Sequence, residues 1–320
     1  MQLSTQRWLR DRTYRSADFT VAELVARKRG STVTVVLPAR NEARTVGAIA
    51  AAVQRDLVVP GLVDEVLVVD SHSVDETAAV ATAAGATVRA QAAVLPELGD
   101  RPGKGEALWK ACAAASGDLL VFVDADLEEF DPDYVVGLLG PLLQDPTVAF
   151  VKGMYDRPLA DGATVLPAGG GRVTELVARP LLSAFWPELA GVVQPLAGEY
   201  AARREVLEQV PFAGGYAVEL ALLVDLLGLV GLDALAQVDL GRRVHRHQDD
   251  EALGRMALQI QLAALRRVDP DLVPSAGELV QYRRAGGRFV RTESAVDASD
   301  RPPLRQVEAY RRRRTLATSA

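Results

Sequence analysis

Short apolar runs rich in β-branched residues alternate with longer amphipathic stretches along the first half of the chain. The pattern predicts four strands, at residues 32–37, 65–69, 87–90 and 119–123. The stretches between them have the apolar spacing of helices, at residues 45–55, 74–84 and 106–116. Strands that alternate with helices are typical of βαβ units with right-handed crossovers. We therefore expect an α/β fold with a mostly parallel sheet.

The alternation loosens after residue 150. We expect helices from about residue 173, over 212–229 and over 250–267, and a strand over 237–240. Beyond residue 269, Pro, Gly, Arg and Ser dominate, which is typical of loops and a mobile end. The second half is therefore expected to be mainly helical, with loops and one short helix at its end.

The composition is that of an ordinary globular protein, with 49% hydrophobic and 24% charged residues among 320. A net charge of −6 argues against general nucleic-acid binding. The N-terminus lacks an apolar signal core, and acidic residues interrupt the longest apolar stretch, 216–238. We therefore expect a cytoplasmic protein with no nucleic-acid partner and no membrane association. The single cysteine, Cys112, is expected to be a buried structural thiol.

Two carboxylates follow the fourth predicted strand, in the run Asp124-Ala125-Asp126. Alternate residues of an extended chain point to the same side. Carboxylate oxygens suit Mg²⁺ or Mn²⁺, which commonly bind one or two carboxylates together with substrate phosphates. A metal held there would neutralise the charge of a departing diphosphate. The alternative is a strand-end Asp that caps the next turn.

A glycine-rich turn with a lysine opens the predicted helix before this strand. Residues 101–106 read RPGKGE, which places Lys104 at the start of the helix. Backbone amides, a helix N-terminus and an ammonium together favour a phosphate. The run is not a P-loop, because the G-x-x-x-x-G-K-[ST] pattern is absent. A flexible loop with a solvated lysine is the alternative.

Polar residues also follow the first and second predicted strands. Residues 38–42, from Pro38 to Glu42, could present a backbone edge and a carboxylate to a base or ribose, and Asp70 and Ser71 could bind the same groups. Each alone is more typical of a turn. Ligands of open α/β sheets bind beyond the carboxyl ends of the strands, so the three strand ends together predict a nucleotide site.

A second glycine-rich turn, residues 169–174, leads into a helix and contains Arg172. Arginine can grip a carboxylate or a phosphate through its planar fork, so we interpret this turn as the site of an anionic acceptor. Glu219 lies in an otherwise apolar helix and must be paired or belong to a site, since a lone buried carboxylate is costly. His245 follows a strand and is a candidate third metal ligand or a surface histidine.

Several runs of the sequence resemble the glucosyl-3-phosphoglycerate synthase family. This is a group of retaining GT-A glycosyltransferases to which mannosyl-3-phosphoglycerate synthases are related. The resemblance spans roughly residues 30 to 255 and rests on the runs PARNE (38–42), DSHSVDET (70–77), RPGKGEALW (101–109), DAD (124–126), GGGRVTELVARP (169–180), PLAGEYAARRE (195–205), PFAGGYAVE (211–219) and HRH (245–247).

The resemblance implies a GT-A, Rossmann-like fold with a mainly helical acceptor-binding C-terminal part. It also implies a divalent cation, UDP-glucose as donor, and 3-phosphoglycerate as acceptor, with the anomeric configuration retained. It implies these roles: for the nucleotide sugar, Ala39, Arg40, Glu42, Ser71, Lys104, Asp124 and Ala125; for the metal, Asp126 and His245; for the acceptor pocket, Gly171, Arg172, Val173 and Thr174; near the transferring sugar, Glu219 and Arg243.

Three positions depart from the family pattern. Ala125 stands where serine is usual, Arg40 where leucine is usual beside the nucleobase, and His247 where asparagine is common near the acceptor phosphate. The backbone of the metal-binding run is unchanged by Ala125, so metal binding is expected to survive. The preference for base and acceptor is left open by these changes.

We expect the chain to divide into four stretches and to form a homodimer. The stretches are a lead-in (1–30), a nucleotide-sugar half (31–150), an acceptor half (151–268) and a partly mobile extension (269–320). The nearest alternative is the same chemistry with GDP-mannose. A sugar nucleotidyltransferase would share paired carboxylates and a phosphate-binding lysine but would release pyrophosphate. A sugar-nucleotide sensor would bind without turnover.

Overall fold

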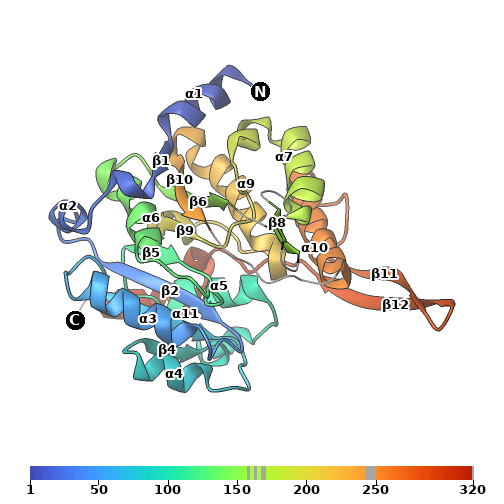
Figure 1. The fold of residues 1–320 in the computed structure, drawn as a ribbon, viewed down its shortest axis with the longest axis horizontal. Helices are drawn as coiled ribbons and strands as arrows, with labels where there is room; N and C mark the ends of the chain where they lie inside the picture. Colours follow the sequence, from blue (N-terminus) through green and yellow to red (C-terminus); the bar gives the residue numbers. More distant parts are fainter. Residues whose placement is uncertain (157–158, 162–163, 167–170, 243–249, 319–320) are drawn as a thin grey trace.

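An eight-stranded sheet runs through the computed structural model, in the order β1-β10-β6-β9-β5-β2-β3-β4 (Figure 1). The structure describes residues 1–156, 159–161, 164–166, 171–242 and 250–318. The strands are β1 (Thr13–Arg15), β2 (Val33–Ala39), β3 (Glu65–Asp70), β4 (Thr87–Ala90), β5 (Leu119–Phe122), β6 (Phe150–Asp156), β7 (Leu159–Asp161), β8 (Thr164–Leu166), β9 (Tyr200–Arg203), β10 (Leu235–Arg242), β11 (Ala276–Ala285) and β12 (Arg288–Asp297).

The pairing of the strands is mostly parallel, as predicted. β2 pairs in parallel with β3 and β5, and β3 with β4, so the ends of the first, second and fourth predicted strands lie next to one another. β9 is the exception, because it runs antiparallel between β5 and β6. The sheet crosses the expected boundaries at residues 30 and 150, since β1 lies at one edge and β6 and β10 belong to the same sheet. Those boundaries stay predictions.

Helices cover both faces of this sheet. They are α1 (Leu3–Asp11), α2 (Val21–Arg27), α3 (Val46–Val53), α4 (Thr77–Ala83), α5 (Lys104–Ala114), α6 (Asp133–Gln144), α7 (Arg179–Phe185), α8 (Arg204–Leu207), α9 (Val218–Val230), α10 (Asp250–Val268) and α11 (Glu308–Thr318). Two π-helical segments, η2 (Gln54–Val58) and η5 (Thr174–Ala178), follow α3 and precede α7. No helix among the described residues has the length and apolar character needed to cross a membrane.

Alternate residues of β5 divide the core into two layers. Leu119 and Val121 pack with α3 and α6 on one face, whereas Leu120 and Phe122 pack with α5 and α9 on the other. Full burial of a side chain such as Phe122 contributes roughly 1.5–3 kcal/mol. The continuous apolar runs seen in the sequence are thus strands buried on both faces. Cys112 is buried in the α5 layer, as expected, and burial raises the pKa of its thiol to about 12.

The C-terminal stretch differs in part from the expectation of loops, a short helix and a mobile end. β11 and β12 form an antiparallel hairpin that projects from the body beside α10 (Figure 1). Its turn is Gly286-Gly287, with φ of 55° and 77°, the backbone that a tight hairpin turn requires. After the hairpin the chain returns to the core, where Arg301, Leu304 and Tyr310 are buried. The expectation of loops is therefore wrong for residues 276–297, whereas α11 is the expected short helix.

Candidate active site

Lys104 lies between two carboxylates at the carboxyl edge of the sheet. Its Nζ is 2.7 Å from Asp124 Oδ1 and 2.8 Å from Glu219 Oε1. Lys104 begins α5, Asp124 comes shortly after β5, and Glu219 lies in the first turn of α9. The expectation that Glu219 must be paired or belong to a site is confirmed, and its partner is Lys104.

The charges of this group are held in a largely buried setting. The exposed fraction of the side chain is 20% for Lys104, 21% for Asp124 and 4% for Glu219. Burial opposes the charged form of Lys104, but attraction to Asp124 and Glu219 prevails and raises its pKa well above the usual value. Lys104 is therefore a permanent cation. An ammonium has three N–H donors. Within the described part of the chain the two carboxylates take two of them, which leaves one for a ligand oxygen.

The Asp124-Ala125-Asp126 run is fixed from two sides. The Oγ1 atom of Thr45 donates a hydrogen bond of 2.6 Å to the carbonyl of Ala125. On the other side Asp124 packs against Gly198, where an added Cβ would lie 2.3 Å from Asp124 Oδ2. Ala125 is buried, and Asp126 is exposed at the surface beyond the strand. The run thus presents one carboxylate to Lys104 and one toward solvent.

The loops after β2 and β3 are bound to each other. Asn41, with φ of 59°, accepts from the Val74 amide through Oδ1 at 2.8 Å, and its own amide donates to Ser73 Oγ at 2.9 Å. The Glu42 amide donates to Thr77 Oγ1 at 2.8 Å. These bonds explain why the predicted helix over 74–84 begins only at residue 77. They also hold the two strand-end loops together as one rim.

The predicted nucleotide-binding residues lie along this rim. Pro38 and Ala39 end β2, and Ser71 is buried with its amide donating to the Ala39 carbonyl at 2.8 Å. Arg40 is exposed and Glu42 is half-buried. The structure brings these residues together at the ends of adjacent strands, and their contact with a nucleotide stays a prediction.

Lys152 of β6 is a charged residue of this region that sequence reasoning missed. Its side chain is buried, with Nζ 5.1 Å from the centroid of the Tyr200 ring. No described residue provides a hydrogen-bond partner for Lys152 Nζ or for the Tyr200 hydroxyl. Burial lowers the pKa of Lys152 to about 8, although the charges of Glu219, Glu199 and Asp124 favour the ammonium. A lysine inside the apolar run 148–155 was the available signal.

The predicted acceptor residues begin the segment that leads to α7. Gly171 has φ of 91°, Arg172 is exposed, and Val173 and Thr174 are buried. Arg172 thus stands on the first turn of a helical segment with its side chain at the surface. Gly169, Gly170, Arg243, His245 and His247 lie outside the described residues.

Asp126 is the only predicted metal ligand that the structure describes. Within the described ranges, no three acidic, histidine or cysteine side chains gather into a metal-binding group. The site still fits a divalent cation, because Mg²⁺ usually takes only one or two carboxylates and completes its shell with phosphate oxygens and water. The exposed carboxylate of Asp126 at a strand end provides such a ligand.

In an open, mostly parallel sheet, ligands bind beyond the carboxyl ends of the strands, and Asp124 and Asp126 follow the central strand β5 at that edge. The sequence model of a family described as glycosyl transferase family 2 matches residues 34–209, which is more than half of the chain. This match includes Lys104, Asp124, Asp126 and Arg172 but not Glu219.

Curated and solved proteins extend the similarity over nearly the whole chain. A glucosyl-3-phosphoglycerate synthase of Mycolicibacterium smegmatis is 49% identical, over 93% of this chain and 97% of the relative. A crystal structure of the Mycobacterium tuberculosis enzyme in complex with Mn²⁺, UDP-glucose and phosphoglyceric acid has a TM-score of 0.80 at 45% identity, covering 91% of this chain and 96% of that one.

A second kind of synthase is also similar in structure. The crystal structure of mannosyl-3-phosphoglycerate synthase from Rubrobacter xylanophilus has a TM-score of 0.87 at 41% identity, covering 95% of this chain and 98% of that one. The chain therefore belongs to glycosyl transferase family 2 and, within it, to the family of the glucosyl-3-phosphoglycerate synthases.

Proposed function

We propose that this chain transfers glucose from UDP-glucose to the 2-hydroxyl of 3-phosphoglycerate, with retention of the anomeric configuration. The observation that carries the proposal is the Lys104 ammonium held between Asp124 and Glu219, at the ends of the strands where a nucleotide sugar would bind. The family relationship gives this arrangement its substrates. Both substrates are negatively charged: UDP-glucose carries a diphosphate, and 3-phosphoglycerate carries a phosphate and a carboxylate. Such charges suit a site built around a fixed cation and helix N-termini.

The donor binds at the rim formed by the loops after β2 and β3. Ala39, Arg40, Glu42 and Ser71 hold the base and ribose, and the rim is preorganised because its two loops are bonded to each other. Lys104 directs its remaining N–H toward the diphosphate, and Asp124 and Ala125 border the sugar. A cation fixed in advance stabilises charge as it develops on the leaving group, with no reorganisation at the moment of reaction.

Mg²⁺ or Mn²⁺ would be held by Asp126 together with His245. The metal supplies Lewis-acid charge neutralisation on the departing diphosphate. In the chain itself, Asp124 pairs with the Lys104 ammonium and Asp126 is exposed.

The acceptor is assigned to the turn that begins the η5 segment. Arg172 grips an anionic group of 3-phosphoglycerate through its fork, with Gly171, Val173 and Thr174 forming the wall and His247 and Arg243 completing the pocket. Retention proceeds by front-face attack of the acceptor hydroxyl. Glu219 does not suit the alternative of a protein nucleophile, because its carboxylate is nearly inaccessible and bound by Lys104.

The test measures nucleoside diphosphate release with Mg²⁺ and 3-phosphoglycerate, with UDP-glucose, GDP-glucose and GDP-mannose in separate reactions. We expect turnover with UDP-glucose that stops when the acceptor is left out, and a product with the α-linkage of the donor by NMR. Pyrophosphate release would mark a nucleotidyltransferase. Binding of UDP-glucose without turnover would mark a sensor. Either result contradicts the proposal.

GDP-mannose is the second candidate donor. It is favoured by the solved mannosyl-3-phosphoglycerate synthase, whose TM-score of 0.87 exceeds the 0.80 to 0.83 of the structures of the glucosyl enzyme. Higher kcat/KM with GDP-mannose would keep the fold and the site and reassign the donor. The exposed Arg40 on the donor rim would then be the first position to exchange for leucine.

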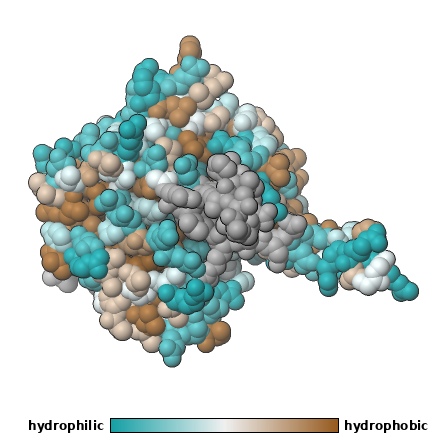
Figure 2. Space-filling view, in the orientation of Figure 1, coloured by the Kyte–Doolittle hydropathy of each residue, from teal (hydrophilic) through white to brown (hydrophobic). Residues whose placement is uncertain are grey.

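We further propose that the chain is a homodimer, with the β11–β12 hairpin in the contact. The hairpin extends well beyond the body of the molecule (Figure 2). Two-stranded hairpins are marginal alone in water, and this one exposes 66% of Tyr282 and 68% of Phe289. Light scattering is expected to give a dimer for the natural chain and a monomer for the Tyr282→Ser, Phe289→Ser variant. A monomer in both samples contradicts the proposal.

A further inference from the structure

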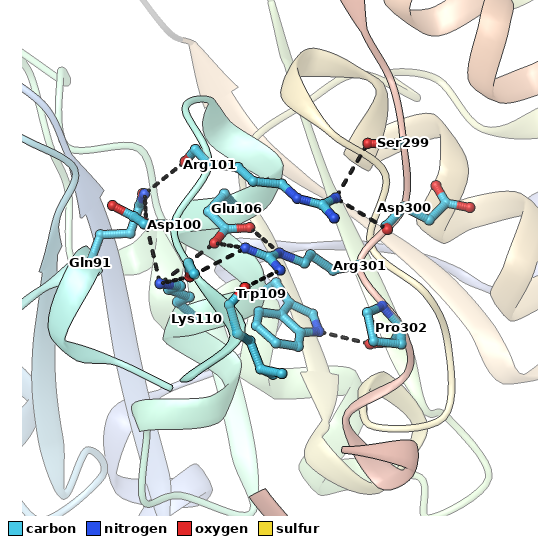
Figure 3. Close-up of polar contacts among 12 residues, drawn as sticks. Gln91, Asp100, Arg101, Glu106, Trp109, Lys110, Ser299, Asp300, Arg301 and Pro302 are labelled. Atoms are coloured by element: carbon cyan, nitrogen blue, oxygen red, sulfur yellow. Dashed lines mark hydrogen bonds and ion pairs between the residues drawn. The ribbon is translucent and has the colours of Figure 1, made fainter. Parts of the chain in front are cut away.

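Arg301 is a buried arginine from the C-terminal stretch that pairs with α5, the helix of Lys104. Its Nε lies 2.5 Å from Glu106 Oε2 and its Nη2 lies 2.6 Å from Glu106 Oε1, which is a bidentate pair (Figure 3). The exposed fraction is 8% for the Arg301 side chain and 2% for Glu106. Glu106 is two positions after Lys104 in the same helical turn, so the pair fixes the end of the helix that presents Lys104.

The same guanidinium also holds the loop before α5. Arg301 Nη1 donates to the carbonyl of Leu98 at 2.9 Å. Lys110 donates to the carbonyl of Gly99 at 2.9 Å. It also donates to Asp100 Oδ1 at 3.2 Å (Figure 3). Asp100 in turn lies 2.7 Å from His72 Nε2. The network therefore joins α5 to the residue that follows Ser71 on the donor rim.

The backbone of Arg301 reaches a third segment. Its amide donates to the Phe212 carbonyl at 2.8 Å, and the Phe212 amide donates back at 3.1 Å. The next residue, Ala213, packs on α5 so closely that a Cβ added at Gly105 would lie 1.9 Å from the Ala213 carbonyl oxygen. The segment from residue 212 leads within a few residues into α9, which carries Glu219.

We propose that Arg301 is a positioning residue of the transferase site, which sets the contact between Lys104 and Glu219 by clamping α5 to the segment that enters α9. The proposal rests on the function proposed above, because Lys104 and Glu219 are assigned to the reaction there. Arg301 itself does not touch the site group: its side chain contacts Glu106, the Leu98 and Gly99 carbonyls and the Trp109 ring.

The charges around Arg301 explain why lysine would not replace it. Glu106 faces both Arg301 and Lys110, and Asp100 faces Lys110 and His72. Lysine supplies a point charge without the fork that matches a carboxylate. Arg301→Lys keeps the net charge of the cluster but loses the bidentate geometry and the bond to Leu98. This variant therefore changes position more than charge.

A matched control lies at the other end of the same helix. Arg204 is equally buried and donates to the carbonyls of Cys112, Ala115 and Gly117, where α5 ends. Arg204→Lys should destabilise the chain in a similar way without moving Lys104. A third variant, Arg301→Met with Glu106→Gln, removes both partners, so that no unpaired charge is left in the interior.

The experiment measures thermal unfolding, kcat and the KM of each substrate for the natural chain and these variants. We expect Arg301→Lys to lower kcat/KM for UDP-glucose by about tenfold or more, since small misplacements of site groups have effects of this size or larger, while KM for 3-phosphoglycerate changes little. The double variant is expected to show the same kinetic defect with a smaller loss of stability. Arg204→Lys is expected to lower the unfolding temperature and leave kcat/KM unchanged.

A direct binding measurement separates this proposal from the proposed function. Calorimetry of UDP binding in Mg²⁺ needs no turnover, and we expect weaker binding for both Arg301 variants and unchanged binding for Arg204→Lys. If the natural chain binds UDP but does not transfer glucose, the function proposal fails while the Arg301 proposal is still tested by that binding. Unchanged UDP binding and kcat/KM in both Arg301 variants, or the same defect in Arg204→Lys, would overturn the positioning role.

Discussion

At the scale of single residues, the candidate site depends on how Glu219 uses its carboxylate. One oxygen accepts from Lys104 at 2.8 Å, in a side chain that is 4% exposed. We predict that Glu219→Gln, which keeps the shape but halves the negative charge around Lys104, lowers kcat by about tenfold to a hundredfold, because the ammonium is no longer held in its place. The exposed Glu205 provides the matched variant, Glu205→Gln, for which full activity is expected.

The same position also tests the stereochemical route. Front-face attack forms no bond between protein and sugar. Mass spectrometry of the Glu219→Ala variant with UDP-glucose is therefore expected to show no glucosyl adduct, and azide is expected to restore no activity. A trapped adduct or an azide-dependent gain in rate would establish Glu219 as a nucleophile.

Lys152 is expected to lower the free energy of unfolding while it supplies a positive charge near Glu219 and Asp124. Its Nζ is buried with no hydrogen-bond partner among the described residues, and its pKa is lowered to about 8. The unfolded chain, with a lysine pKa of about 10.4, binds more protons between these values. The free energy of unfolding therefore rises with pH over that window, and below about 8 the full cost of the buried charge is present.

We predict that Lys152→Met raises the free energy of unfolding at pH 7, by the order of 2 kcal/mol. The gain is expected to shrink as the pH rises from 8 toward 10, where the natural lysine loses its proton. Activity at pH 7 is expected to fall, because Glu219 and Asp124 lose a nearby positive charge. Denaturant titrations at pH 7 and 9.5 measure the first effect. A variant that is less stable at pH 7 would mean that Lys152 is a packing residue.

At the scale of elements, the position of Lys104 depends on the close packing of α5 against the backbone of Ala213. The helix has glycine at position 105, where an added Cβ would meet the Ala213 carbonyl at 1.9 Å. Gly105→Ala is predicted to lower the free energy of unfolding by about 1–3 kcal/mol, the usual cost of overpacking, and to lower kcat by displacing Lys104 from Glu219.

Gly228 of α9 is the matched control, since an added Cβ there meets nothing within 4 Å. Gly228→Ala is predicted to raise the free energy of unfolding by about 0.5–1 kcal/mol through helix propensity, with normal activity. Urea titrations and rates of both variants check the pair. Equal stability of the two variants would show that α5 can shift away from Ala213.

Local sequence patterns were sufficient to predict the strands that lie between the two layers of helices. β2, β3 and β5 are continuous apolar runs because both their faces are buried, and the periodicity of the sequence reports that burial directly. The antiparallel β9 was missed, because the four residues YAAR have no distinctive pattern and gain their place from β5 and β6. The β11–β12 hairpin had a usable local signal in Gly286-Gly287 that was outweighed by the polar composition around it.

At the scale of the whole molecule, the contacts that assemble the site are distant in sequence. The cost of burying Glu219 predicted that it was paired or part of a site, but only the fold identifies Lys104 as its partner. Arg301 gave no signal at all, because it stands in a stretch whose Pro and Asp residues suggest a loop. Its burial depends on Glu106, which lies on a different element and is itself ordinary for an amphipathic helix.

The last prediction concerns how far the C-terminal stretch belongs to the folded body. Trp109 is fully buried and donates through Nε1 to the Pro302 carbonyl at 2.9 Å, and Tyr310 is buried against Arg204. Removing residues 298–320 would expose Trp109 and leave Glu106 without its guanidinium, and breaking a buried pair in this way costs about 3–5 kcal/mol. We predict that this truncated chain is insoluble or unfolded at 25 °C.

Removing only residues 312–320 is the matched truncation. It keeps the buried residues that the structure describes in this stretch, which are Ala298, Arg301, Leu304, Val307 and Tyr310. It deletes the last seven of the eleven residues of α11, where Arg312 and Arg313 are exposed. The shorter deletion is predicted to change the free energy of unfolding by less than about 1 kcal/mol, as is usual for exposed helix ends, and to retain kcat. Circular dichroism and activity decide between the two, because a folded, active chain lacking residues 298–320 would mean that the site assembles without the C-terminal clamp.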